Sequence, residues 1–214
     1  VPFLNEHREE LLADTCIVCD TSMWDEDTPA ITSRLRGLVY IEATLHGPSH
    51  DLHSGGYGGS VVNPANALTK ILGQLHDDEG RVRIDGFYDD VDEVSSEQIE
   101  QWNSLGDADV LVLESSGAKA IHGEKGFGTL ERLWSRPTCD INGLWAGYTG
   151  EGAKTVIGAT ASAKISCRLV ASQNPQKIEG SLFAFLEERT PEGCHWTLKS
   201  FGASPAIAVP TDSP

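Results

Sequence analysis

The chain has 214 residues, a formal net charge of −16, 39% hydrophobic residues and 22% charged residues. This is the composition of a globular protein rather than a disordered one. Phosphate backbones and anionic lipids repel so acidic a surface, so neither nucleic acid nor membrane is an expected partner. No apolar run approaches the roughly 18 residues needed to cross a bilayer. The first residue is valine, so we expect a segment or processed product of a longer protein.

The predicted elements start with the end of a helix in residues 1–12 and a buried strand at Thr15–Asp20. Cys16 and Cys19 have C-x-x-C spacing, but positions three apart on a strand point to opposite faces. The five cysteines are too few and too scattered for a disulfide scaffold. We therefore interpret them as structural free thiols, which favours a reducing compartment and a cytoplasmic location.

The next elements are a strand over residues 35–45 and a loop rich in Gly, His and Ser over residues 47–59. Asn63-Pro64 predicts an N-cap and a first-turn proline for a helix over residues 65–75. In the middle of the chain, an acidic loop over residues 85–97 leads to a short helix near 96–105. A second short helix is predicted over 129–134.

The last third contains strands over residues 141–146 and 159–170, a helix opened by Asn174-Pro175, and a strand over 196–201. Apolar and polar residues alternate from Ala161 to Leu169, which is strand periodicity. From residue 35 the order is strand, helix, strand, strand, helix, strand. This order predicts an α+β class, with a split βαβ, ferredoxin-like antiparallel sheet and helices on one face.

Three histidines and an aspartate lie within the eight residues from His46 to His53. Such a cluster suggests a metal module using His46, His50 and His53, but Gly47-Pro48 prevents the helix that would align them. Unrelated surface histidines are the alternative. The following glycines lack the lysine of a nucleotide-binding loop, which excludes a phosphate site of that kind.

Two charged residues have alternative interpretations. Asp20, at the end of the first predicted strand, is placed either to bind a metal or ligand or to cap a turn. Arg168 lies in the alternating strand from 159 to 170. It either binds a carboxylate or simply faces solvent, and the pattern alone favours solvent.

Three ordered sequence blocks resemble the carnosinase and cytosolic nonspecific dipeptidase family. The first, D-L-H-S-G followed by Y-G-G-S-V, spans residues 51–61; the others are G-E-G-A-K-T-V-I at 150–157 and A-K-I-S-C-R-L-V at 163–170. The resemblance implies a two-domain hydrolase, in which a catalytic domain holds two zinc ions and an inserted lid domain forms a homodimer. It assigns residues 1–34 to the catalytic domain, 35–203 to the lid and 204–214 to the return into the catalytic domain.

The resemblance also implies roles for four residues. Asp20 matches a zinc ligand, and His53 matches the lid histidine that polarises the scissile carbonyl in the partner subunit's active site. Thr155 and Arg168 match residues that bind the peptide substrate, with Arg168 on its C-terminal carboxylate. The family's other metal ligands and general base lie outside this chain, so we expect no zinc pair and no peptidase activity from the chain alone. An N-acyl amino acid amidohydrolase lid and a non-catalytic interaction domain are the alternatives.

Overall fold

The computed structural model describes residues 2–16 and 23–209, and the chain divides into two compact units, Val1–Ser33 and Arg34–Pro214. In the first unit, the predicted helix is the short α1, Pro2–Glu6, which buries none of its residues. Cys16 is exposed and outside any strand, so the prediction of a buried strand is wrong at that residue. Asp20 lies outside the described residues.

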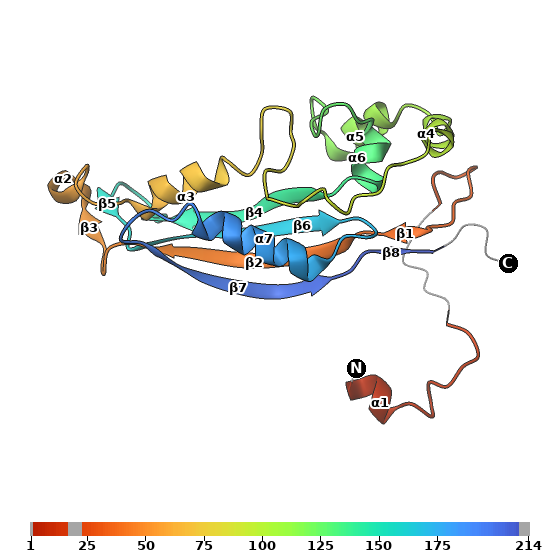
Figure 1. The fold of residues 1–214 in the computed structure, drawn as a ribbon, viewed down its shortest axis with the longest axis horizontal. Helices are drawn as coiled ribbons and strands as arrows, with labels where there is room; N and C mark the ends of the chain where they lie inside the picture. Colours follow the sequence, from red (N-terminus) through yellow and green to blue (C-terminus); the bar gives the residue numbers. More distant parts are fainter. Residues whose placement is uncertain (1, 17–22, 210–214) are drawn as a thin grey trace. The chain divides into compact units, whose positions relative to one another are not determined.

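The second unit is built on a four-stranded antiparallel sheet with strand order β4-β6-β2-β7 (Figure 1). Its strands are β2 (Gly37–His46), β4 (Thr138–Ala146), β6 (Thr160–Leu169) and β7 (His195–Ser204). The two helices that pack against this sheet are α3, Pro64–Leu72, and α7, Pro175–Glu187. The predicted ferredoxin-like βαββαβ arrangement is therefore confirmed.

The two helices begin in the same way. The side-chain oxygen of Asn63 accepts a hydrogen bond from the Ala65 amide at 2.9 Å, and that of Asn174 accepts one from the Lys177 amide at 3.0 Å. A proline at the first turn follows each asparagine, where its missing N–H costs nothing. The sequence signals for both helix starts are thus confirmed.

Both helices pack on the same face of the sheet. The odd-numbered residues of β2 and β6 are buried there with one face of each helix, as alternation along a strand requires. This core includes Val39, Ile41, Ala43, Ile165, Cys167, Leu68, Ile71, Ile178, Leu182 and Leu186. The even-numbered residues of β2 point to the opposite face and are only partly buried.

Two small two-stranded sheets lie at opposite ends of the central sheet (Figure 1). At one end, β1 (Arg34–Leu35) pairs with β8 (Ile207–Ala208), so the strand predicted from residue 35 is interrupted at Arg36. At the other end, β3 (Leu52–His53) pairs with β5 (Val156–Ile157). The short helix α2, Ser54–Tyr57, follows β3, so the expected loop over residues 47–59 contains regular structure.

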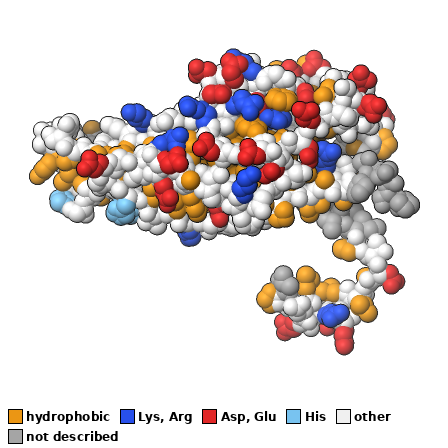
Figure 2. Space-filling model, in the orientation of Figure 1, with side chains coloured by type: hydrophobic (Ala, Val, Ile, Leu, Met, Phe, Trp, Pro, Cys, Tyr) orange, Lys and Arg blue, Asp and Glu red, His pale blue; other side chains and the backbone are white. Residues whose placement is uncertain are grey.

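The segment between α3 and β4 carries α4 (Ser96–Asn103), α5 (Ala108–Ser116) and α6 (Thr129–Trp134). Helices α4 and α6 match the helices predicted near residues 96–105 and over 129–134, whereas α5 was not predicted. Figure 2 shows Asp and Glu side chains interspersed with Lys and Arg on the visible face. No described helix is long and apolar enough to span a membrane.

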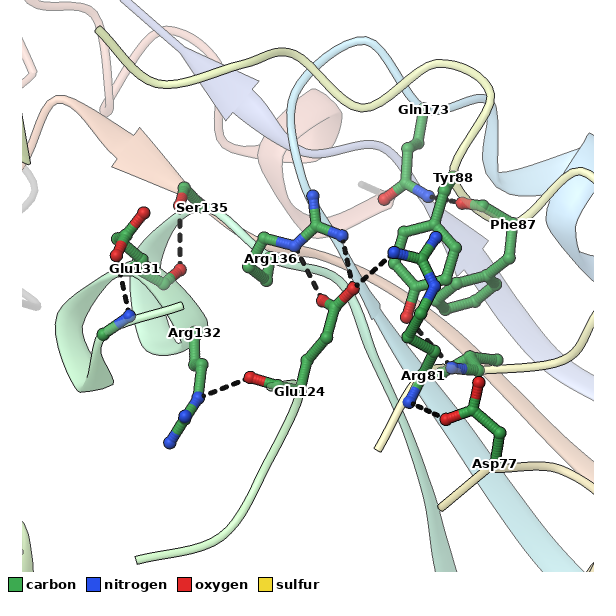
Figure 3. Close-up of polar contacts among 12 residues, drawn as sticks. Asp77, Arg81, Phe87, Tyr88, Glu124, Glu131, Arg132, Ser135, Arg136 and Gln173 are labelled. Carbon is green, nitrogen blue, oxygen red and sulfur yellow. Dashed lines mark hydrogen bonds and ion pairs between the residues drawn. The ribbon is translucent and has the colours of Figure 1, made fainter. Parts of the chain in front are cut away.

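Glu124 ties this segment together (Figure 3). Its carboxylate is 6% exposed and accepts two hydrogen bonds from the Arg136 guanidinium, at 2.7 and 2.8 Å. Arg81 forms a second ion pair with it at 3.2 Å. Both guanidiniums also lie over the Tyr88 ring, 4.4 Å and 4.9 Å from its centroid. A buried carboxylate is tolerated only with such complete pairing, so Glu124 fixes where the segment returns to the sheet.

Candidate functional site

His53 and Thr155 come together at the β3–β5 end of the sheet. His53 pairs with Val156 across the two strands, and the Ser54 amide donates a hydrogen bond to the Thr155 carbonyl at 3.0 Å. The Nε2 atom of His53 lies 3.2 Å from the Thr155 hydroxyl oxygen. Both side chains are exposed, so this pair can meet a ligand.

The hydrogen bonding of His53 selects one tautomer of the neutral ring. Its Nδ1 atom accepts a hydrogen bond from the Gly55 amide at 3.0 Å, which makes His53 the N-cap of α2. In a neutral imidazole one nitrogen accepts and the other donates. The ring proton therefore lies on Nε2, where it can be donated to Thr155 or to the carbonyl oxygen of a ligand.

Glycines and an aspartate hold this loop in place. A Cβ atom at Gly55 would lie 2.7 Å from Cε1 of His53, and one at Gly58 would lie 2.5 Å from the Ser54 carbonyl oxygen. The Asp51 carboxylate accepts a hydrogen bond from the Ala159 amide at 2.9 Å, which attaches the loop to the start of β6. The glycine-rich sequence thus serves to bring the backbone close to the imidazole.

Arg168 is the residue before the last of β6, at the end of the strand opposite Thr160. It is exposed, and it pairs in register with Leu38 of β2 on one side and Thr138 of β4 on the other. Arg168 follows Thr160 by eight residue steps of extended strand, which corresponds to about 26 Å. One copy of this chain therefore does not bring Arg168 near His53 and Thr155.

The histidine cluster does not form a shared metal site. His46 stacks on His195, with ring centroids 4.7 Å apart, and its Nε2 atom bonds the Thr197 hydroxyl at 2.9 Å. His50 bonds Ser49 instead. Within residues 2–16 and 23–209, no three His, Cys, Asp or Glu side chains converge as metal ligands do. The proposed module of His46, His50 and His53 is therefore wrong in its geometry, and the described residues do not fit a zinc pair.

The sequence matches a known protein family and several curated relatives. Residues 34–194 match the model of the peptidase dimerisation domain. The chain is 32% identical over 167 residues to the Cys-Gly metallodipeptidase dug1 of Schizosaccharomyces pombe, covering 78% of this chain and 35% of that protein. It is 30% identical over 174 residues to the human Beta-Ala-His dipeptidase, covering 80% of this chain and 34% of that protein. The chain thus spans about a third of the length of these relatives.

Solved structures agree with the sequence relatives. An M20 family metallo-carboxypeptidase from Sulfolobus solfataricus matches with a TM-score of 0.80 and 31% identity, over 99% of this chain and 48% of that one. Human carnosine dipeptidase 1 matches with a TM-score of 0.74 and 26% identity, over 86% of this chain and 40% of that one. The ferredoxin-like sheet, its two helices and the family match together show that this chain belongs to the peptidase dimerisation domain family.

Proposed function

We propose that the parent protein is a dinuclear zinc dipeptidase and that residues 35–203 are its lid and homodimerisation domain. The flanking residues 1–34 and 204–214 then belong to the catalytic domain. The antiparallel pairing of β1 with β8 supports this division, because it places the chain's entry to the domain beside its exit. The metal chemistry belongs to the remainder of the parent, and Asp20 is its one ligand in this chain.

The main support for this proposal is the distance between Arg168 and the pair formed by His53 and Thr155. An extended dipeptide spans only about 7 Å, whereas Arg168 is at least about 26 Å along β6 from the end where His53 and Thr155 lie. A single dipeptide touches all three only if they come from two copies of the chain. A homodimer with sites shared between subunits meets this requirement.

The three side chains then have distinct roles. The guanidinium of Arg168 binds the substrate's C-terminal carboxylate with two parallel hydrogen bonds. The Nε2–H of His53 in the partner subunit donates to the scissile carbonyl oxygen and stabilises the negative charge that develops there. Thr155 holds the imidazole in this orientation when substrate is absent and contacts the peptide when it is bound. Free thiols at Cys139 and Cys167 support a cytoplasmic location for the parent.

Subunit complementation tests the shared site. The full-length parent is prepared as His53→Ala and as Arg168→Ala, each nearly inactive, and equal amounts are mixed under conditions that exchange subunits. Half of the dimers are then mixed, and each holds one intact site of two, so activity recovers to about a quarter of wild type. Mixtures in which both preparations carry the same substitution serve as controls. Lack of recovery despite measured subunit exchange would place both residues in one subunit's site and overturn the proposal.

A further inference from the structure

A second arginine lies at the Arg168 end of the sheet. Arg36 immediately precedes β2, and Leu38, two residues further on, is the register partner of Arg168. Arg36 is therefore two residues from the register partner of Arg168, at the same end of the sheet. Gly37, between Arg36 and Leu38, lies close to the end of β7: a Cβ atom at this position would lie 2.6 Å from the Ser204 carbonyl oxygen.

The two guanidiniums interact with each other. Partial desolvation is the largest effect that lowers the pKa of Arg36, repulsion by Arg168 lowers this pKa further, and attraction to Asp140 opposes both effects. The Asp140 carboxylate also accepts a hydrogen bond from the Thr138 hydroxyl at 3.1 Å. Two cations thus face one acidic group that is already hydrogen-bonded.

Neither cation has an ion pair of its own in the described chain. The arginines that form ion pairs with carboxylates there are Arg81, Arg136 and Arg189. Bringing two guanidiniums together costs free energy unless an anion binds between them. The planar donors of arginine suit a carboxylate, which accepts from two guanidiniums with its two oxygens.

We propose that Arg36 is a second carboxylate-binding residue, which holds the C-terminal carboxylate of the peptide substrate jointly with Arg168. This inference rests on the proposed function and adds to it a positively charged pair at the carboxylate end of the substrate. It makes the parent selective for peptides with a free C-terminus over the same peptides with a C-terminal amide.

Kinetics of the full-length parent test this role. With a dipeptide substrate, Arg36→Ala raises KM about tenfold to a hundredfold and changes kcat little, as loss of charge-assisted hydrogen bonds to the bound substrate predicts. Hydrolysis of the dipeptide amide is unchanged, and Arg36→Lys restores part of the loss. The matched control is Arg34→Ala, in the adjacent β1. Equal losses on the dipeptide and its amide would show a merely structural role and overturn the inference.

Chemical protection tests the same site without relying on activity. Phenylglyoxal modifies accessible arginines, and mass spectrometry of peptides reports each position. N-acetylglycine is expected to slow modification of both Arg36 and Arg168 severalfold, whereas its amide does not, and Arg34 is unaffected. If N-acetylglycine protects Arg168 but not Arg36 from phenylglyoxal, Arg36 does not bind the carboxylate and the inference is wrong. Protection of both in a parent that hydrolyses no peptide would instead contradict the proposed function and leave the carboxylate site standing.

Discussion

The Nε2 atom of His53 lies 3.2 Å from the hydroxyl oxygen of Thr155, 102 positions later in the chain. The contact depends on the pairing of β3 with β5 and on the close approach of the Gly55 backbone to the imidazole. The orientation of His53 is thus determined by a backbone position that carries no chemistry itself. That dependence gives a direct test of the site.

We expect Gly55→Ala to displace the imidazole, because the added Cβ would lie 2.7 Å from Cε1 of His53. The histidine side chain can rotate away, so the fold is retained while the Nε2–H loses its direction. In the full-length parent, kcat/KM is expected to fall about a hundredfold to a thousandfold, the range for losing one positioned donor. Steady-state kinetics with a thermal unfolding curve measures both effects.

The neighbouring glycine is a matched control for that substitution. Gly56 belongs to the same short helix, and a Cβ atom there would meet nothing within 4 Å. Gly56→Ala should therefore leave kcat/KM unchanged. An equal loss from both substitutions would mean that the helix as a whole, rather than contact with His53, controls activity.

Glu124→Ala is expected to destabilise the protein by about 3 kcal/mol, because it leaves Arg136 partly buried without its counter-charge. Urea unfolding of the chain measures this loss. Glu79→Ala is the control: it removes the exposed ion pair with Lys125 and should leave the free energy of unfolding nearly unchanged. Similar losses from the two would contradict the structural role of the Glu124 cluster.

The dimer interface is a proposal that the sheet order makes testable. β4 is an edge strand, and its Ile141 side chain is exposed at 43%. Pairing of β4 with its counterpart in a second copy would continue the sheet, with α3 beside the junction. Ile141→Lys is expected to weaken the dimer at least tenfold, as measured by sedimentation. Phe201→Lys, on the opposite edge strand β7, should have no effect; a reversed outcome would move the interface to β7.

Much of the fold was predictable because local signals agreed with the tertiary structure. The alternation from Ala161 to Leu169 identified β6, and the Asn-Pro pairs identified the starts of α3 and α7. Helix α5 was missed because its apolar run, Val110 to Leu113, has no clear helical period. Its usable signals were the cap at Asp107 and the left-handed Gly117, with φ of 71°.

The site was less predictable, because its contacts are long-range. His53 and Thr155 were singled out by family resemblance, and nothing in their local sequence indicates that β3 pairs with β5. Arg36 carried no signal either, because it lay within the run interpreted as one strand. Its proximity to Arg168 follows from the register of β2 with β6, which the sequence pattern leaves open.

The last prediction concerns Cys139 and Cys167, which lie directly opposite each other in the core. The Cys167 S–H donates a hydrogen bond to the Cys139 sulfur, and this bond, together with burial, holds the pKa of the Cys167 thiol well above its ordinary value of 9.0. The native thiol therefore keeps its proton at pH values where the unfolded thiol loses it. The contribution of this thiol to the free energy of unfolding is therefore fully present below pH 9.0 and decreases as the pH rises above that value.

Cys167→Ala should remove this pH dependence. The free energy by which wild type is more stable than the variant is expected to shrink above pH 9, by roughly 1.4 kcal/mol per pH unit at most. Urea unfolding between pH 7 and 10.5 measures the difference, in which titration of other groups cancels. Cys16→Ala, at an exposed thiol, should run parallel to wild type. A constant difference between wild type and Cys167→Ala would mean that the thiol ionises equally in the folded and unfolded states, contrary to its burial between the strands and the helices.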